Sequence, residues 1–95
     1  MNNQYETALS IVKDYESYLE FVHEQQGYSL EQMSYSKWAV DEIFKYLDEQ
    51  KTSAPLVVIE NFRDRMDRYS RLNEKNGLIF SVACETAENI IDLFL

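Results

Sequence analysis

Apolar residues recur at alternating steps of three and four along most of the sequence, and this spacing constrains the fold more than any other feature. Such spacing places apolar side chains on one face of an α-helix. In the first stretch that has it, the apolar positions are Tyr5, Ala8, Val12, Tyr15, Leu19 and Val22. We therefore predict a first helix over residues 3–25, which Gly27 ends.

A capping box predicts where the second helix begins. Ser29 is followed three positions later by Gln32, so each side chain can bond the other residue's backbone N–H. The second helix is predicted over residues 30–50, and the polar run DEQKTS closes it. Its inner face consists of Met33, Trp38, Ala39, Val40, Ile43, Phe44 and Leu47.

The third helix is predicted over residues 54–75. Ser53 can cap it. Pro55 is tolerated in the first turn, because backbone N–H groups there have no partner within the helix. Residues 56–59 also have strand propensity, but the apolar positions continue at helical spacing beyond them. A left-handed Gly77 would stop this helix.

The last helix, predicted over residues 78–94, has the widest apolar arc of the four, so it is the most buried helix or faces a partner. Short connections favour antiparallel neighbours. Only two glycines and one proline in 95 residues argue against many short strands. The predicted fold is all-α: a compact antiparallel four-helix bundle, with residues 1–95 forming a single domain.

Charge and composition exclude several classes of function. The formal net charge is −8, so an anionic duplex or membrane surface would be repelled, and we expect no direct binding to nucleic acid or membrane. No apolar run is long enough to span a bilayer, and the first residues do not resemble a secretory signal. The single cysteine, Cys84, fits a reducing compartment, so a cytoplasmic location is expected.

Two features of the sequence have residue types that occur in catalytic or metal sites, and neither predicts an enzyme. Glu20 and His23 have the Glu-x-x-His spacing of di-iron bundles, but such a centre needs two of these motifs and the chain has one histidine. Cys84 lies on an apolar helix, where burial would raise the pKa of the thiol and make it inert. We expect no catalytic residue, no metal and no cofactor.

Two groups of residues are candidates for protein contacts. Tyr18, Tyr35 and Tyr46 lie off the best apolar stripes, and their rings suit either the edge of a core or an interface. Glu16, Glu20 and Glu24 stand one turn apart on one helix face. They are either solvated surface or a phosphate-like row that fits a basic groove of a nucleic-acid-binding protein.

All four arginines of the chain lie between residues 63 and 71. Spacing predicts that Arg63 pairs with Glu60 or Asp67, Arg68 with Asp64, and Arg71 with Asp67, so the segment largely neutralises itself. Arg65 has no acid at these spacings. We expect it to reach an acid of another helix, an aromatic face or a second molecule.

The C-terminal half, especially ENFRDRMDRYSRLNEKNGLIFSVACETAENIIDLF, resembles small helical proteins carried by mobile genetic elements of Firmicutes-type bacteria. The resemblance covers residues 54–94. That group has no assigned activity, so the resemblance implies no site residue. It does imply an accessory or anti-defence role.

These observations favour a non-catalytic, acidic protein-interaction module that self-associates, for example as a homodimer, through the last helix or the tyrosine-bearing faces. The alternative is an acidic nucleic-acid mimic that inhibits a nucleic-acid-binding enzyme, of the anti-CRISPR or anti-restriction type.

Overall fold

Four helices make up the protein in a computed structural model that describes residues 3–51, 54–73 and 75–94. They are α1 (Asn3–Gln26), α2 (Leu30–Gln50), α3 (Pro55–Leu72) and α4 (Gly77–Asp92). The prediction of an all-α four-helix bundle is confirmed. Residues 56–59 are helical, and Val58 and Ile59 among them belong to the inner face of α3.

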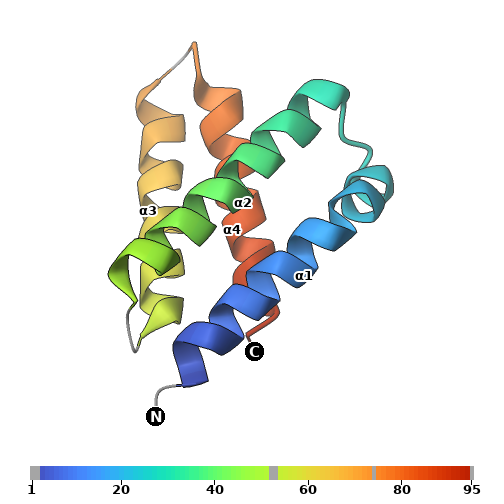
Figure 1. The fold of residues 1–95 in the computed structure, drawn as a ribbon. Helices are drawn as coiled ribbons and strands as arrows, with labels where there is room; N and C mark the ends of the chain where they lie inside the picture. The colour runs from blue at the N-terminus through green and yellow to red at the C-terminus, as the bar shows by residue number, and fades with distance from the viewer. Residues whose placement is uncertain (1–2, 52–53, 74, 95) are drawn as a thin grey trace.

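The helices form two hairpins stacked in two layers. Figure 1 shows α1 and α2 in front, crossing obliquely over α3 and α4 behind them. The closest packing is between α3 and α4, followed by α2 against α4 and α1 against α2. Helix α1 makes few contacts with α3 or α4, so it is held mainly by α2 and its side toward α4 is lightly covered.

The core consists of the predicted apolar stripes. From α1 it takes Ala8, Val12, Tyr15 and Leu19; from α2 Ala39, Val40, Ile43 and Leu47; from α3 Val58, Ile59, Phe62 and Met66; and from α4 Ala83, Ala87, Ile90 and Ile91. Polar contacts join the first hairpin at its open end, where the Tyr5 hydroxyl donates to Asp48 Oδ1 at 3.1 Å. The ammonium group of Lys13 lies 5.6 Å from the centre of the Phe44 ring.

Both predicted signals at the α1–α2 turn are confirmed. Gly27 has a φ of 69°, and the N–H groups of Gly27 and Tyr28 donate to the carbonyls of Glu24 and His23, which is a Schellman motif. The Ser29 N–H donates to Gln32 Oε1 at 2.8 Å, and the Gln32 N–H donates to Ser29 Oγ at 3.1 Å. These bonds satisfy end groups of both helices.

The predicted boundaries at the α3–α4 turn were wrong. Helix α3 ends at Leu72 instead of residue 75, and α4 covers residues 77–92 instead of 78–94. Gly77 is the first residue of α4 and has no positive φ. A Cβ atom at this position would lie 3.3 Å from the Ser70 carbonyl oxygen, so close approach of the two helices accounts for the glycine.

The other ends of α2 and α3 differ in their caps. The C-cap of helix α2 is Lys51. This residue takes the left-handed conformation with a φ of 44° and donates its N–H to the Leu47 carbonyl at 3.0 Å. Pro55 is the first residue of α3, as predicted. The predicted cap Ser53 lies outside the described residues.

Candidate protein-interaction surfaces

The Glu20–His23 pair does not form a metal site in this fold. Glu20 is exposed, whereas His23 is 2% exposed and its ring stacks on Tyr28 with 5.1 Å between ring centres. Both ring nitrogens of His23 lack a hydrogen-bond partner among the described residues, and burial lowers the pKa of the imidazole. Across residues 3–51, 54–73 and 75–94, no group of three or more His, Cys, Asp or Glu side chains is arranged to hold a metal ion.

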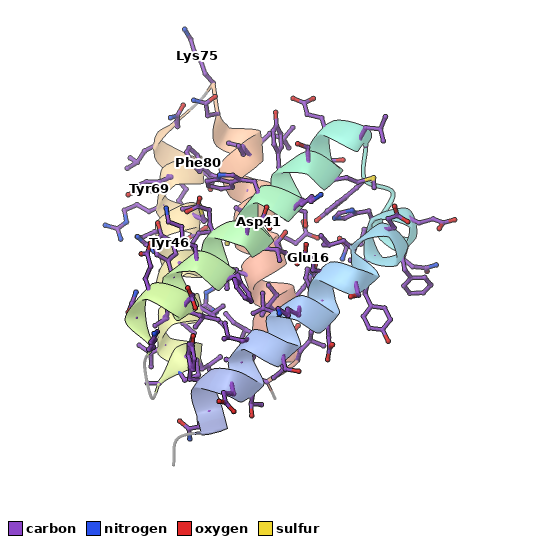
Figure 2. All side chains as sticks on the ribbon, in the orientation of Figure 1. Glu16, Asp41, Tyr46, Tyr69, Lys75 and Phe80 are labelled. Atoms are coloured by element: carbon purple, nitrogen blue, oxygen red, sulfur yellow. The ribbon has the colours of Figure 1, made fainter. Side chains whose placement is uncertain are left out.

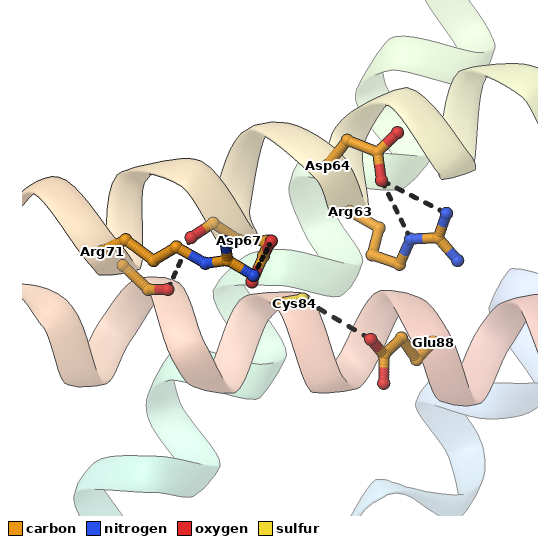
Figure 3. Close-up of polar contacts among 7 residues, drawn as sticks. Arg63, Asp64, Asp67, Arg71, Cys84 and Glu88 are labelled. Carbon is orange, nitrogen blue, oxygen red and sulfur yellow. Dashed lines mark hydrogen bonds and ion pairs between the residues drawn. The ribbon is translucent and has the colours of Figure 1, made fainter.

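Cys84 is half-buried on α4, and its thiol donates a long hydrogen bond to Glu88 Oε1 at 3.7 Å (Figure 3). Burial, followed by the neighbouring Glu88 and Asp67 carboxylates, raises the pKa of Cys84 to about 11. The thiolate is the reactive form of cysteine, so this thiol is poorly reactive near neutral pH. The predicted direction of the shift is confirmed.

Two ion pairs form in the arginine segment among the described residues. Arg71 Nη2 lies 3.0 Å from Asp67 Oδ2, as the spacing predicts. Arg63 instead pairs with its neighbour Asp64 at 3.2 Å (Figure 3), so the predictions that Arg63 pairs with Glu60 or Asp67 and that Arg68 pairs with Asp64 were wrong. Arg68 is exposed and has no ion pair in the described part of the chain.

Arg65 contacts aromatic faces within its own chain. Its guanidinium carbon lies 4.9 Å from the centre of the Tyr46 ring and 6.0 Å from that of Phe62. The Tyr46 and Phe62 rings are themselves 6.1 Å apart, and both belong to the α2–α3 packing. Cation–π contacts of this kind contribute about 0.5–2 kcal/mol. Arg65 and Tyr46, both interface candidates by sequence, are therefore engaged in internal packing.

The remaining sequence candidates lie on and beside the α1–α2 face. Glu16, Glu20 and Glu24 are all exposed, and Figure 2 places Glu16 on the same side of the molecule as Asp41 of α2. A groove of about 530 Å³ between the helices is lined by Glu16, Ser17, Leu19, Glu20, His23, Leu30, Met33, Ser34 and Lys37. Tyr35 is half-buried, and a hydrogen bond from its hydroxyl to the Glu31 carboxylate raises the pKa of Tyr35.

A second groove lies between α1 and α4, and we call it the α1–α4 groove. It has a volume of about 370 Å³ and is lined by Tyr15, Tyr18, Phe21, Val22, Gln26, Asn89, Asp92 and Leu93. Tyr18 is 62% exposed, Phe21 60% and Leu93 54%. Single exposed apolar side chains are normal on a protein surface, but here three large ones are exposed together.

The floor of the α1–α4 groove is fixed by a polar contact between its two walls. Asn89 Nδ2 of α4 donates to the buried Tyr15 hydroxyl of α1 at 3.3 Å. Burial raises the pKa of Tyr15, hydrogen bonds with Asn89 and Ser36 oppose the rise, and the nearby Glu85 carboxylate adds to it. The floor is therefore a neutral phenol held in place, and the exposed aromatic rings stand above it.

The rim of the α1–α4 groove is acidic. Asp92 lines it directly, and Asp14 lies one turn before Tyr18 on α1. No lysine or arginine occurs in residues 77–95, and Lys13 of α1 lies over Phe44 of α2. A partner for this groove must therefore supply apolar side chains and positive charge.

Comparison of the chain with protein-family models, with curated proteins and with solved structures finds no match. In the described residues, no helix is long and apolar enough to cross a membrane.

Sequence reasoning found only part of the α1–α4 groove. Tyr18 was an interface candidate, whereas Phe21 and Leu93 were not. One signal was available: Phe21 lies three residues after Tyr18, so both rings stand on the same outer edge of α1.

Proposed function

We propose that this chain is a non-catalytic, acidic protein-interaction module that binds a basic amphipathic segment in the α1–α4 groove. One observation carries the proposal: Tyr18, Phe21 and Leu93 are exposed together around a groove whose rim is acidic. Aromatic anchors with a polar rim are the usual composition of a protein interface. The lone, poorly reactive Cys84 fits a cytoplasmic location, which is part of the same proposal.

The dimensions of the groove define the kind of segment it would take. Its α1 wall runs from Tyr15 to Gln26, a length of about 16 Å at the helical rise of about 1.5 Å per residue. A partner helix of about three turns covers that length. Such a helix would insert apolar residues at positions i, i+4 and i+7 between the two walls and hold lysine or arginine against the acidic rim.

The first prediction is that the groove binds a synthetic cationic amphipathic helix of about 11 residues, with Leu at i, i+4 and i+7 and Lys elsewhere. Replacing both Tyr18 and Phe21 by Ala should weaken this binding about tenfold or more, because exposed aromatic anchors supply most of the energy of such contacts. Isothermal titration calorimetry measures both affinities. The double variant keeps every charge, so non-specific attraction to an acidic protein is unchanged in it.

Two controls make this experiment decisive. Leu30→Ala removes an even more exposed apolar side chain, at 84% exposure, from a different surface and should leave the affinity unchanged. A peptide with Glu in place of Lys should bind much more weakly to the unmodified protein. Equal affinity of the Lys peptide for the parent and the Tyr18→Ala, Phe21→Ala protein would show that the groove is not the binding surface.

The nucleic-acid-mimic function is kept as a second candidate because of one observation. Glu16, Glu20 and Glu24 are all exposed, and none of them has an ion pair within the described part of the chain. Such a row can imitate the phosphates that a basic protein groove binds. The resemblance of residues 54–94 to mobile-element proteins supports an accessory or anti-defence role of this kind, and that role also stays a proposal.

The second prediction tests this candidate by charge reversal. If the acidic row acts as a mimic, the protein inhibits DNA cleavage by a basic nuclease of the restriction or CRISPR type, and added salt weakens the inhibition. Replacing Glu16, Glu20 and Glu24 by Lys should abolish it. A matched triple reversal of Glu6, Glu42 and Glu49, away from the row, should retain most of it. Absence of inhibition across a nuclease panel, or equal inhibition by both variants, counts against the mimic.

A further inference from the structure

A second exposed apolar surface lies where α3 ends and α4 begins, and we call it the α3–α4 tip. Leu72 is 76% exposed there, and Tyr69 and Leu78 are about half-exposed. The Tyr69 ring meets the edge of the Phe80 ring, with 5.4 Å between ring centres. Tyr69, Leu72, Asn73 and Phe80 surround a hollow of about 260 Å³, and Figure 2 shows Tyr69, Phe80 and Lys75 at this end of the molecule.

The α3–α4 tip carries a small excess of basic side chains. Residues 67–78 contain three of them, Arg68, Arg71 and Lys75, and two acids, Asp67 and Glu74. All three basic side chains are exposed, and Arg71 holds Asp67 as its ion-pair partner. The tip therefore combines apolar side chains with positive charge, which is the chemistry that the acidic α1–α4 groove requires.

We infer that the basic partner of the α1–α4 groove is the α3–α4 tip of a second copy of this chain, so that copies associate head to tail. This inference rests on the proposed function of the groove and names its occupant. Tyr69 and Leu72 of one copy would enter the groove beside Tyr18 and Phe21 of the next. Arg68, Arg71 and Lys75 would face the acids of the groove rim, Asp14 and Asp92.

Geometry prevents the tip from occupying the groove of its own chain. Leu78 lies at the first turn of α4 and Leu93 just beyond its last residue, which is a separation of about 22 Å along a helix. The two surfaces thus lie at opposite ends of α4. A contact between different surfaces on two copies leaves one groove and one tip free at the ends, so association continues unless a ring closes.

Charge also argues against a symmetric dimer through either surface. Two grooves facing each other would place the carboxylates of Asp14 and Asp92 against their own copies, and two tips would place arginine against arginine. Such juxtaposed like charges oppose association. The head-to-tail contact is the arrangement of these two surfaces in which opposite charges meet.

A complementation experiment tests the inference. The groove variant carries Tyr18→Ala and Phe21→Ala, and the tip variant carries Arg68→Glu and Arg71→Glu. In sedimentation at tens to hundreds of micromolar, the parent protein should gain mass with concentration, and each variant alone should stay monomeric. Their mixture should form a one-to-one complex and nothing larger, because the groove variant retains a tip and the tip variant retains a groove.

Several outcomes would overturn the inference: a parent protein that stays monomeric, a variant that associates alone as the parent does, or a mixture that stays monomeric. A symmetric groove-to-groove or tip-to-tip interface cannot give complementation, because one of the two variants would then associate alone. Circular dichroism must show native helix content in both, and a second pair, Phe21→Gln and Leu72→Gln, replaces either variant that fails to fold. If the parent is monomeric but its groove still binds the Lys peptide, the head-to-tail contact is wrong while the proposed function stands.

Discussion

Replacing Thr86 by Val is expected to lower the free energy of unfolding by about 1–3 kcal/mol, the cost of leaving a buried polar group without its partner. Ser36 of α2 and Thr86 of α4 are both almost fully buried, and their hydroxyl oxygens are 2.8 Å apart. The Thr86 hydroxyl donates its one hydrogen to the Val82 carbonyl at 2.8 Å. It must therefore accept from Ser36, and valine removes that acceptor while preserving the shape of the side chain.

The same geometry predicts an asymmetry that urea unfolding can measure. Ser36→Ala should cost less than Thr86→Val, because the Thr86 hydroxyl keeps its bond to Val82 when serine is removed. The double variant should be more stable than the sum of the two costs implies, since no buried hydroxyl is then left unpaired. Equal costs that simply add would show that the two hydroxyls do not depend on each other.

The sequence was sufficient to predict the four helices and their buried faces, because each helix buries one apolar stripe. Ala8, Val12, Tyr15 and Leu19 are spaced so that one face of α1 carries them all, and the structure buries all four. The same rule placed Phe62 and Met66 inside. Local chemistry was equally informative at Ser29 and Gln32, whose capping bonds involve only residues three positions apart.

Sequence could not predict which polar residues are buried. Ser36 and Thr86 meet across 50 positions of chain, and each alone looks like a surface residue of an amphipathic helix. His23 is polar and does not belong to the predicted stripe of α1, but the turn after Gly27 brings Tyr28 back over the imidazole ring. The role of Gly77 was also non-local, because it depends on the Ser70 carbonyl of the preceding helix.

The interaction surfaces depend on how the two hairpins cross, which no single helix encodes. The groove that exposes Tyr18 and Phe21 exists because α1 leans on α2 and makes few contacts with α4. Tyr46 looked equally available by spacing, yet α3 approaches α2 there and brings Phe62 and Arg65 against its ring. Spacing therefore identifies which side chains leave the main stripe, and tertiary packing decides which of them stay exposed.

Lowering the pH is expected to destabilise the protein through His23. Burial lowers the pKa of His23 in the folded state, while the unfolded chain has an ordinary histidine pKa of about 6.5. Below pH 6.5, His23 therefore binds a proton in the unfolded state but not in the folded state. The free energy of unfolding falls with pH until the pH reaches the pKa of His23 in the folded state. The slope for one group is at most about 1.4 kcal/mol per pH unit.

The groups around His23 do little to stabilise its protonated imidazole ring. The ring stacks on Tyr28, whose pKa is itself raised by burial and by the nearby Glu85 carboxylate. Glu16, Glu20 and Lys37 line the adjacent groove, and both ring nitrogens of His23 lack a partner among the described residues. A proton on this ring would therefore be buried without a hydrogen-bond partner, which is why the pKa of His23 is lowered.

His23→Phe isolates this contribution, because phenylalanine keeps a ring against Tyr28 and cannot titrate. The measurement is the free energy of unfolding of both proteins from pH 7.5 to 5.5. The carboxylates titrate alike in the two chains, so the stability of the parent relative to the variant should fall as the pH drops through 6.5. A difference that stays constant over this range would mean that His23 binds its proton equally well in the folded and unfolded states, and that the buried ring is not the source of acid sensitivity.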